Sequence, residues 1–197
     1  MLKRSSLGLL RQLSAMLGFA LLATGAFAQQ QVINFDPNRT KVEFTLGDFL
    51  HTVHGTFKLK SGNIRFDSAT GAASGALIVD ASTGESGNKS RDKKMHADVL
   101  ESRTYPEIVF IPRRVVGHVP QQGSSQVTVE GVLRMHGSER PMTLNVPFSI
   151  DGHQVTANTR FDIPYETWGV KNPSTFILRV SNKVQIDIAA NGSIAGE

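Results

Sequence analysis

The chain contains no cysteine among its 197 residues. This absence excludes disulfide bonds, thiolate zinc sites, a catalytic thiol and a lipoprotein anchor attached through cysteine. The aromatic residues are mostly phenylalanine, since the chain has 11 Phe but only 2 Tyr and 1 Trp. Metal or nucleophile chemistry would therefore have to rest on the six histidines and on acidic or hydroxyl side chains.

The sequence also lacks the short motifs that carry catalytic chemistry. It has no H-E-x-x-H, no G-x-S-x-G, no P-loop and no G-x-G-x-x-G. The histidines are scattered, and the spacing of His51 and His54 places their rings on opposite faces of an extended strand. We therefore expect no catalytic residues, no metal and no cofactor, with a quinone- or lipid-modifying enzyme as the less favoured alternative.

Long hydrophobic runs are missing. The apolar stretch at residues 13–23 is about half of the roughly 20 residues that a membrane-spanning helix needs. It follows Lys3, Arg4 and Arg11 and precedes an A-x-A motif at residues 26–28, which is the pattern of a secretory signal peptide. We expect residues 1–28 to be cleaved and residues 29–197 to form one mature domain. That domain would be exported to the periplasm or secreted, and would not span a membrane.

The positive net charge of the full chain comes mostly from its N-terminal segment. The formal net charge is +4, but the predicted signal peptide carries three of the 21 basic residues and none of the 17 acidic ones. The mature chain would keep 18 basic against 17 acidic residues, a net charge of +1. A nearly neutral domain lacks the basic footprint of nucleic-acid binding, so no nucleic-acid partner is expected.

What is abundant is a period-two alternation of apolar and polar residues. It recurs at 127–135, 142–150, 155–163 and 184–188, and further strands are expected at 41–46, 56–60, 64–66, 75–79 and 108–111. Turn residues punctuate it at 61–63, 67–71, 121–125, 136–138 and 151–152. Short strands with one buried face at this spacing predict an all-β sandwich or barrel.

One segment breaks this rhythm. Residues 88–100 begin with Asn88, a suitable N-cap, and place Met95 four residues before Val99 and His96 four before Leu100. We expect one short helix inserted into the β fold.

The order of several motifs adds a resemblance to a known family. The specific part is Ser90-Arg91-Asp92-x-x-Met95 followed by Tyr105-Pro106-x-Ile108-x-Phe110, and weaker matches are Val42-x-Phe44, Gly55-x-Phe57, Gly62-x-Ile64, Gly131-Val132-Leu133-x-x-His136-Gly137 and Val180-Ser181-x-x-Val184-x-Ile186. Over residues 32–190 the chain resembles the YceI-like family of lipid- or polyisoprenoid-binding proteins. Residues 165–174 depart from the Asp-Tyr/Trp-Gly-Met pattern usual for this family.

The resemblance implies a fold and a ligand. The fold is a lipocalin-like antiparallel β-barrel of about eight strands with a helix near one opening. The ligand is a long isoprenoid of the quinone or prenyl-phosphate type, or another amphiphilic lipid, held without chemical change in an apolar tunnel.

Candidate ligand contacts follow from the apolar and polar side chains. Those for the tunnel are Phe44, Phe49, Phe57, Phe66, Met95, Leu100, Phe110, Met135, Phe148, Phe161, Trp168 and Phe176. Those for a head group at the mouth are His51, His54, Arg91, Lys94 and His96. The main alternative is a packed β module with a structural or interaction role and no ligand. The identity of the lipid and the formation of a homodimer stay open.

Overall fold

The computed structural model describes residues 30–47, 52–174 and 179–195. Its strands are β1 (Gln30–Phe35), β2 (Lys41–Gly47), β3 (Thr52–Asp67), β4 (Ala73–Glu85), β5 (Glu107–Val116), β6 (Gly123–Met135), β7 (Ser138–Asp151), β8 (Gln154–Ile163) and β9 (Val184–Ile194). Its helices are α1 (Lys89–Lys94), the π-helical turn η1 (Met95–Val99) and the 3-10 turn η2 (Tyr165–Trp168). The predicted all-β class with one inserted helix is confirmed.

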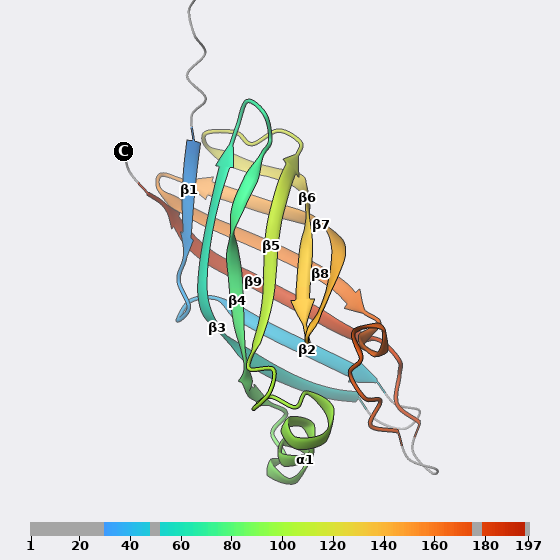
Figure 1. Cartoon of the computed structure of the whole chain (residues 1–197). Coiled ribbons are helices and arrows are strands. Elements are labelled where there is room, and N and C mark those ends of the chain that lie inside the picture. The colour runs from blue at the N-terminus through green and yellow to red at the C-terminus, as the bar shows by residue number, and fades with distance from the viewer. Residues whose placement is uncertain (1–29, 48–51, 175–178, 196–197) are drawn as a thin grey trace, which may run out of the picture.

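The strands form one antiparallel sheet that closes into a barrel (Figure 1). The sheet order is β1-β3-β2-β9-β8-β7-β6-β5-β4, and β4 pairs back onto β3. β1 and β2 both lie between β3 and β9, β2 along the first half of β3 and β1 along its second half. Because these two strands share one position, nine strands make a barrel of eight, as predicted.

Close packing of β1 depends on two glycines. Phe35 is paired with Gly62 of β3 and with Gly192 of β9. A Cβ atom at Gly62 would lie 2.9 Å from the Phe35 Cβ, and one at Gly192 would lie 2.5 Å from the Asn34 carbonyl oxygen. The two glycines therefore let β1 approach both neighbours, and the Phe35 ring covers Gly62.

The turn predicted at residues 61–63 is wrong. β3 runs without a break through this segment, with only a shift in its pairing to β4 between Leu59 and Ser61. Gly62 looked like a turn residue but serves the close approach of Phe35. A glycine in the sequence is equally consistent with a turn and with the close approach of a neighbouring strand. Only the position of that strand distinguishes the two.

The helix predicted at residues 88–100 is confirmed, with an internal change of type. The Asn88 side chain caps α1 by accepting from the Ser90 and Arg91 amides at 3.1 and 3.0 Å. The chain then widens into η1, so the insertion is a six-residue α-helix followed by a five-residue π-helical turn. No helix among the described residues is long and apolar enough to cross a membrane.

Candidate functional site

An apolar cavity of about 160 Å³ occupies the barrel interior. All nine strands line it, and every lining residue except Asn158 and Thr159 is apolar. The alternation along each strand points these apolar side chains to one side, so they face the interior of the closed barrel. Such a lining offers no charged group to a ligand and favours a hydrocarbon chain.

The structure places three of the expected tunnel phenylalanines, Phe57, Phe110 and Phe161, on the cavity wall. Phe44 lies behind Phe57, with ring centroids 5.3 Å apart. Phe66 is buried, and Phe148 is half-buried, without lining the cavity.

The other expected tunnel residues lie elsewhere. Met135 and Trp168 belong to the core cluster at one barrel end. Met95 and Leu100 are half-buried on the helical insertion and do not line the cavity. Phe49 and Phe176 lie outside the described residues. Direct contact of any of these side chains with a lipid stays a prediction.

The barrel end next to the helical insertion is closed by the segment after β8. Tyr165, Trp168 and Val170 pack there against Leu133 and Ile163. This segment was absent from the strand prediction because its residues do not alternate; its only sequence signal was the departure from the family pattern.

Polar contacts fasten this closing segment. The Trp168 indole donates to the Leu133 carbonyl at 3.4 Å, and the Tyr165 hydroxyl donates to the Ser181 carbonyl at 2.6 Å. Burial raises the pKa of Tyr165 to about 12, because the phenolate would lose its hydration, and neighbouring Glu166 adds to the shift. Arg140 of β7 lies over the Trp168 ring, 5.6 Å from its centroid, and donates to the Thr167 carbonyl at 2.8 Å.

The predicted mouth residues on the helix bind the protein's own atoms. His96 Nε2 donates to the Gly84 carbonyl at 2.8 Å, which leaves Nδ1 to accept from the buried Ser102 hydroxyl at 3.1 Å. Arg91 donates to the Ser86 hydroxyl and carbonyl, both at 2.7 Å. Asp92 in turn accepts from the Ser86 amide at 2.9 Å. These contacts anchor the helix to the end of β4.

Of the remaining mouth residues, Lys94 lies on α1 and His54 on β3. Lys94 is exposed, and His54 is exposed on β3 with its Nδ1 3.0 Å from the Thr45 hydroxyl. His51 lies outside the described residues. Within the described ranges, no hydrogen bond joins His54 to Arg91, Lys94 or His96, and a head-group site shared by these side chains stays a prediction.

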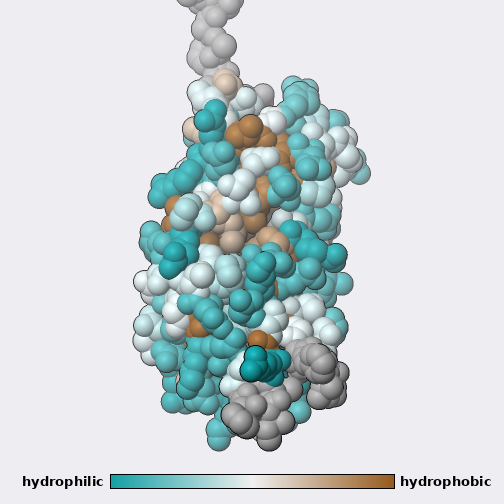
Figure 2. All heavy atoms as spheres, turned by 90° about the vertical axis from the view of Figure 1, so that its right-hand side faces the viewer, coloured by the Kyte–Doolittle hydropathy of each residue, from teal (hydrophilic) through white to brown (hydrophobic). Residues whose placement is uncertain are grey.

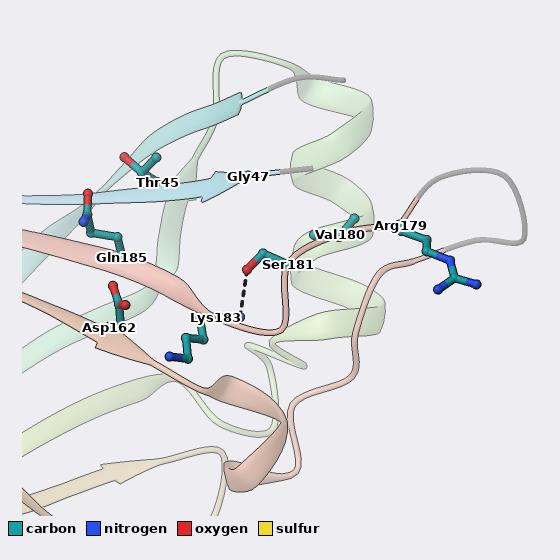
Figure 3. A pocket seen from close by; sticks show the side chains of 8 residues that line it. All are labelled: Thr45, Gly47, Asp162, Arg179, Val180, Ser181, Lys183 and Gln185. Carbon is teal, nitrogen blue, oxygen red and sulfur yellow. Dashed lines mark hydrogen bonds between the residues drawn. The ribbon is translucent and has the colours of Figure 1, made fainter. Parts of the chain in front are cut away.

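A second, polar pocket of about 660 Å³ lies on the outer wall (Figure 3). Thr45, Gln185 and Asp162 form a row across β2, β9 and β8, and Lys183 and Arg179 also line the pocket. Sequence reasoning missed this pocket, because it depends on which strands are neighbours in the barrel.

These elements define a closed antiparallel β-barrel with an apolar internal cavity. The chain belongs to the YceI-like family, whose domain model matches residues 34–191. It is 30% identical over 187 residues to a UPF0312 protein of Pseudomonas putida (strain GB-1), an alignment that covers 89% of this chain and 93% of the relative. A UPF0312 protein of Vibrio parahaemolyticus is 28% identical over 130 residues, covering 64% of this chain and 67% of that protein.

Solved structures share the fold. The barrel superposes with a TM-score of 0.67 on BcnA of Burkholderia cenocepacia, at 20% identity, covering 82% of this chain and 99% of that one. A polyisoprenoid binding domain from Saccharophagus degradans, implicated in plant cell wall breakdown, gives a TM-score of 0.68 at 14% identity, with 83% and 98% covered.

Proposed function

We propose that this protein is an exported carrier that holds a long apolar lipid, of the isoprenoid type, inside its barrel and does not alter it. The observation that carries this proposal is the internal cavity, whose wall is apolar apart from Asn158 and Thr159. None of the described residues that line it is titratable, so they offer a lipid neither a general acid nor a general base.

The free energy of burial favours binding of a hydrocarbon chain in this cavity over binding of a polar head group. Each methylene group moved from water into an apolar site contributes about 0.8 kcal/mol, so a long prenyl chain needs few polar contacts to bind. The structural neighbour from Saccharophagus degradans is a polyisoprenoid binding domain, which supports the same ligand class for this chain. A quinone or a prenyl phosphate would both meet this description.

The cavity volume limits how such a lipid is held. About 160 Å³ is below the roughly 300–1,000 Å³ of pockets that enclose drug-sized ligands. A long chain therefore has to displace side chains or part of the wall when it binds.

Export rests on residues 1–28, which lie outside the described residues. Their basic start, apolar middle and A-x-A motif have the order of a cleavable signal. Cleavage would leave Gln29 as the first residue, immediately before β1.

The test is to express the full chain in a Gram-negative host, purify it from the periplasm, and measure the intact mass and the extracted lipids by mass spectrometry. We expect a mass that corresponds to a start at Gln29 and a co-purified isoprenoid. Protein confined to the cytoplasm at full mass would contradict export. Empty protein that also fails to take up ubiquinone or undecaprenyl phosphate would contradict lipid carriage.

A matched pair of variants on one strand tests the assigned cavity. Phe110→Asp places a carboxylate on the cavity wall, where it is poorly hydrated, so folding or binding should be lost. Val116→Asp changes the same strand at a side chain that is 44% exposed, and should keep both. Equal lipid uptake by the two variants would contradict the assigned cavity.

A further inference from the structure

The seam between β7 and β8 is interrupted. Their pairing runs from Asp151 and Gln154 to Phe148 and Ala157 and stops there. β7 continues over residues 138–147 and β8 over residues 158–163 without pairing to each other, while each stays paired on its other side. We call the space between these two segments the β7–β8 slit.

Proline explains where the pairing stops. In an antiparallel ladder the amides of alternate residues point to the same neighbour. The two-residue turn after Asp151 makes Asp151 and Ser149 bond to β8, so the next residue due to bond is residue 147. That residue is Pro147, which has no N–H, and Pro141 occupies an equivalent position farther along the strand.

The slit is fastened at its ends and bridged once between them. The ladder closes one end, and the contact of Arg140 with the Thr167 carbonyl closes the other. Between them the Thr159 hydroxyl donates to the Asn145 carbonyl at 3.1 Å. One side-chain hydrogen bond thus replaces several backbone hydrogen bonds along this stretch of the wall.

The apolar cavity reaches the slit from inside. Met142, Leu144 and Val146 of β7 line the cavity, and so do Asn158 and Thr159 of β8. Asn158 lines the cavity and is also exposed, so at this seam a single residue separates the cavity from the outer surface. On the side of the molecule near which β7 and β8 lie in Figure 1, hydrophobic residues show between hydrophilic ones (Figure 2).

At each barrel end, in contrast, described side chains are almost fully buried. Trp168 and Tyr165 are 4% and 5% exposed at the end near the helix. Ile150 and Val155, which flank the β7–β8 turn at the other end, are 4% and 3% exposed. A chain that passed through either end would have to displace several packed side chains.

We infer that the β7–β8 slit is the passage through which a lipid chain enters and leaves the barrel, so that its polar head group stays outside at this seam. This inference rests on the proposed function. Separation of β7 from β8 breaks few hydrogen bonds, and it widens the wall where the small cavity has to expand.

The absence of cysteine allows a direct test by cross-linking. Asn145→Cys with Arg160→Cys places thiols on exposed outer positions of the two strands that border the slit. Thr128→Cys with Asn145→Cys places them across the paired β6–β7 seam instead, and serves as the control. Each purified protein is treated with a reducible bifunctional thiosulfonate. Uptake of ubiquinone-10 from phosphatidylcholine vesicles, and its release to them, are then measured before cross-linking, after it and after reduction.

Cross-linking across the slit should lower both rates by roughly ten-fold or more, because the strands can no longer separate, and reduction should restore them. The control should change little. Unchanged rates in the slit pair, with uptake intact, would overturn the passage alone. Failure of every uncross-linked protein to take up ubiquinone-10 would overturn the proposed function and the passage with it.

A second variant tests the same passage without a cross-linker. Pro147→Val restores an N–H where the ladder stops, so pairing can extend toward Asn158. Uptake and release should both become slower by similar factors. A variant that folds and exchanges ubiquinone-10 at the wild-type rates would contradict the role of this proline.

Discussion

Individual side chains were predicted best where the alternation alone decides their direction. Phe57, Phe110 and Phe161 were expected to face inward, and all three line the cavity. The alternation does not give the position of a residue along the barrel axis. It therefore could not distinguish residues that line the cavity from residues such as Met135 and Trp168, which pack at one end of the barrel. This position is set by the register between strands, which the sequence of one strand does not contain.

The polar candidates were harder to predict, because their partners are backbone atoms distant in sequence. His96 was expected at the mouth of the tunnel, but both of its ring nitrogens form hydrogen bonds within the protein, to Gly84 and Ser102. Nothing in the spacing of His96 revealed the Gly84 carbonyl twelve positions before it.

These contacts predict a stability effect for His96→Ala. The substitution leaves the Gly84 carbonyl and the buried Ser102 hydroxyl without their partner, which should cost about 1–3 kcal/mol in the free energy of unfolding. Urea denaturation measures the change. His118→Ala is the control, because this exposed histidine makes no side-chain hydrogen bond within the described ranges; equal effects of the two variants would show that the His96 contacts contribute little.

Among the elements, those with a period or a cap were predictable. The helix after Asn88 was expected and is present, because the cap and the interruption of the strand pattern are both local signals. β1 and η2 were missed: β1 is short and sits directly after the predicted signal peptide, and η2 is a single irregular turn. Both depend on distant partners, since β1 packs on Gly62 and Gly192 and η2 on Leu133.

The closing turn η2 carries a pH dependence. The pKa of Tyr165 is raised to about 12 in the folded protein, above the ordinary value of 10.0. The neutral hydroxyl is therefore favoured by folding. Its contribution to stability is fully present below pH 10 and is lost as the pH rises toward 12.

Absorbance at 295 nm, which follows tyrosinate formation, checks this expectation. The difference between the titrations of the wild type and Tyr165→Phe isolates this residue, and its midpoint should lie near 12. The variant should also lose less stability than the wild type between pH 10 and 12. A difference titration centred near 10 would show that the Tyr165 hydroxyl is hydrated in the folded protein.

For the whole molecule, local patterns predicted the class of fold but left a sandwich and a barrel open. Closure depends on the return of β4 to β3 and on β1 and β2 sharing one position, and neither is visible within a single strand. The resemblance to the YceI-like family decided the choice. The resemblance could not predict the interruption at Pro147. A proline in a strand breaks the pairing on one side only, and the neighbouring strand on that side has to be known before the broken seam can be named.

A barrel with one interrupted seam should show that interruption in hydrogen exchange. In an antiparallel sheet the amides of alternate residues point to the same neighbouring strand. Along the slit, the amides of Thr143, Asn145 and Arg160 therefore point toward the opposite strand, with which they form no backbone pairing. The amides of Leu144 and Phe161 point instead to the paired strands β6 and β9. In two-dimensional ¹H–¹⁵N spectra after transfer to D₂O, we expect the first set to exchange roughly a hundred-fold faster or more than the second. Because the two sets alternate along the same strands, fraying of a whole strand would accelerate both alike. Equal protection of the two sets would mean that β7 and β8 are paired along their full length in solution, and would remove the slit.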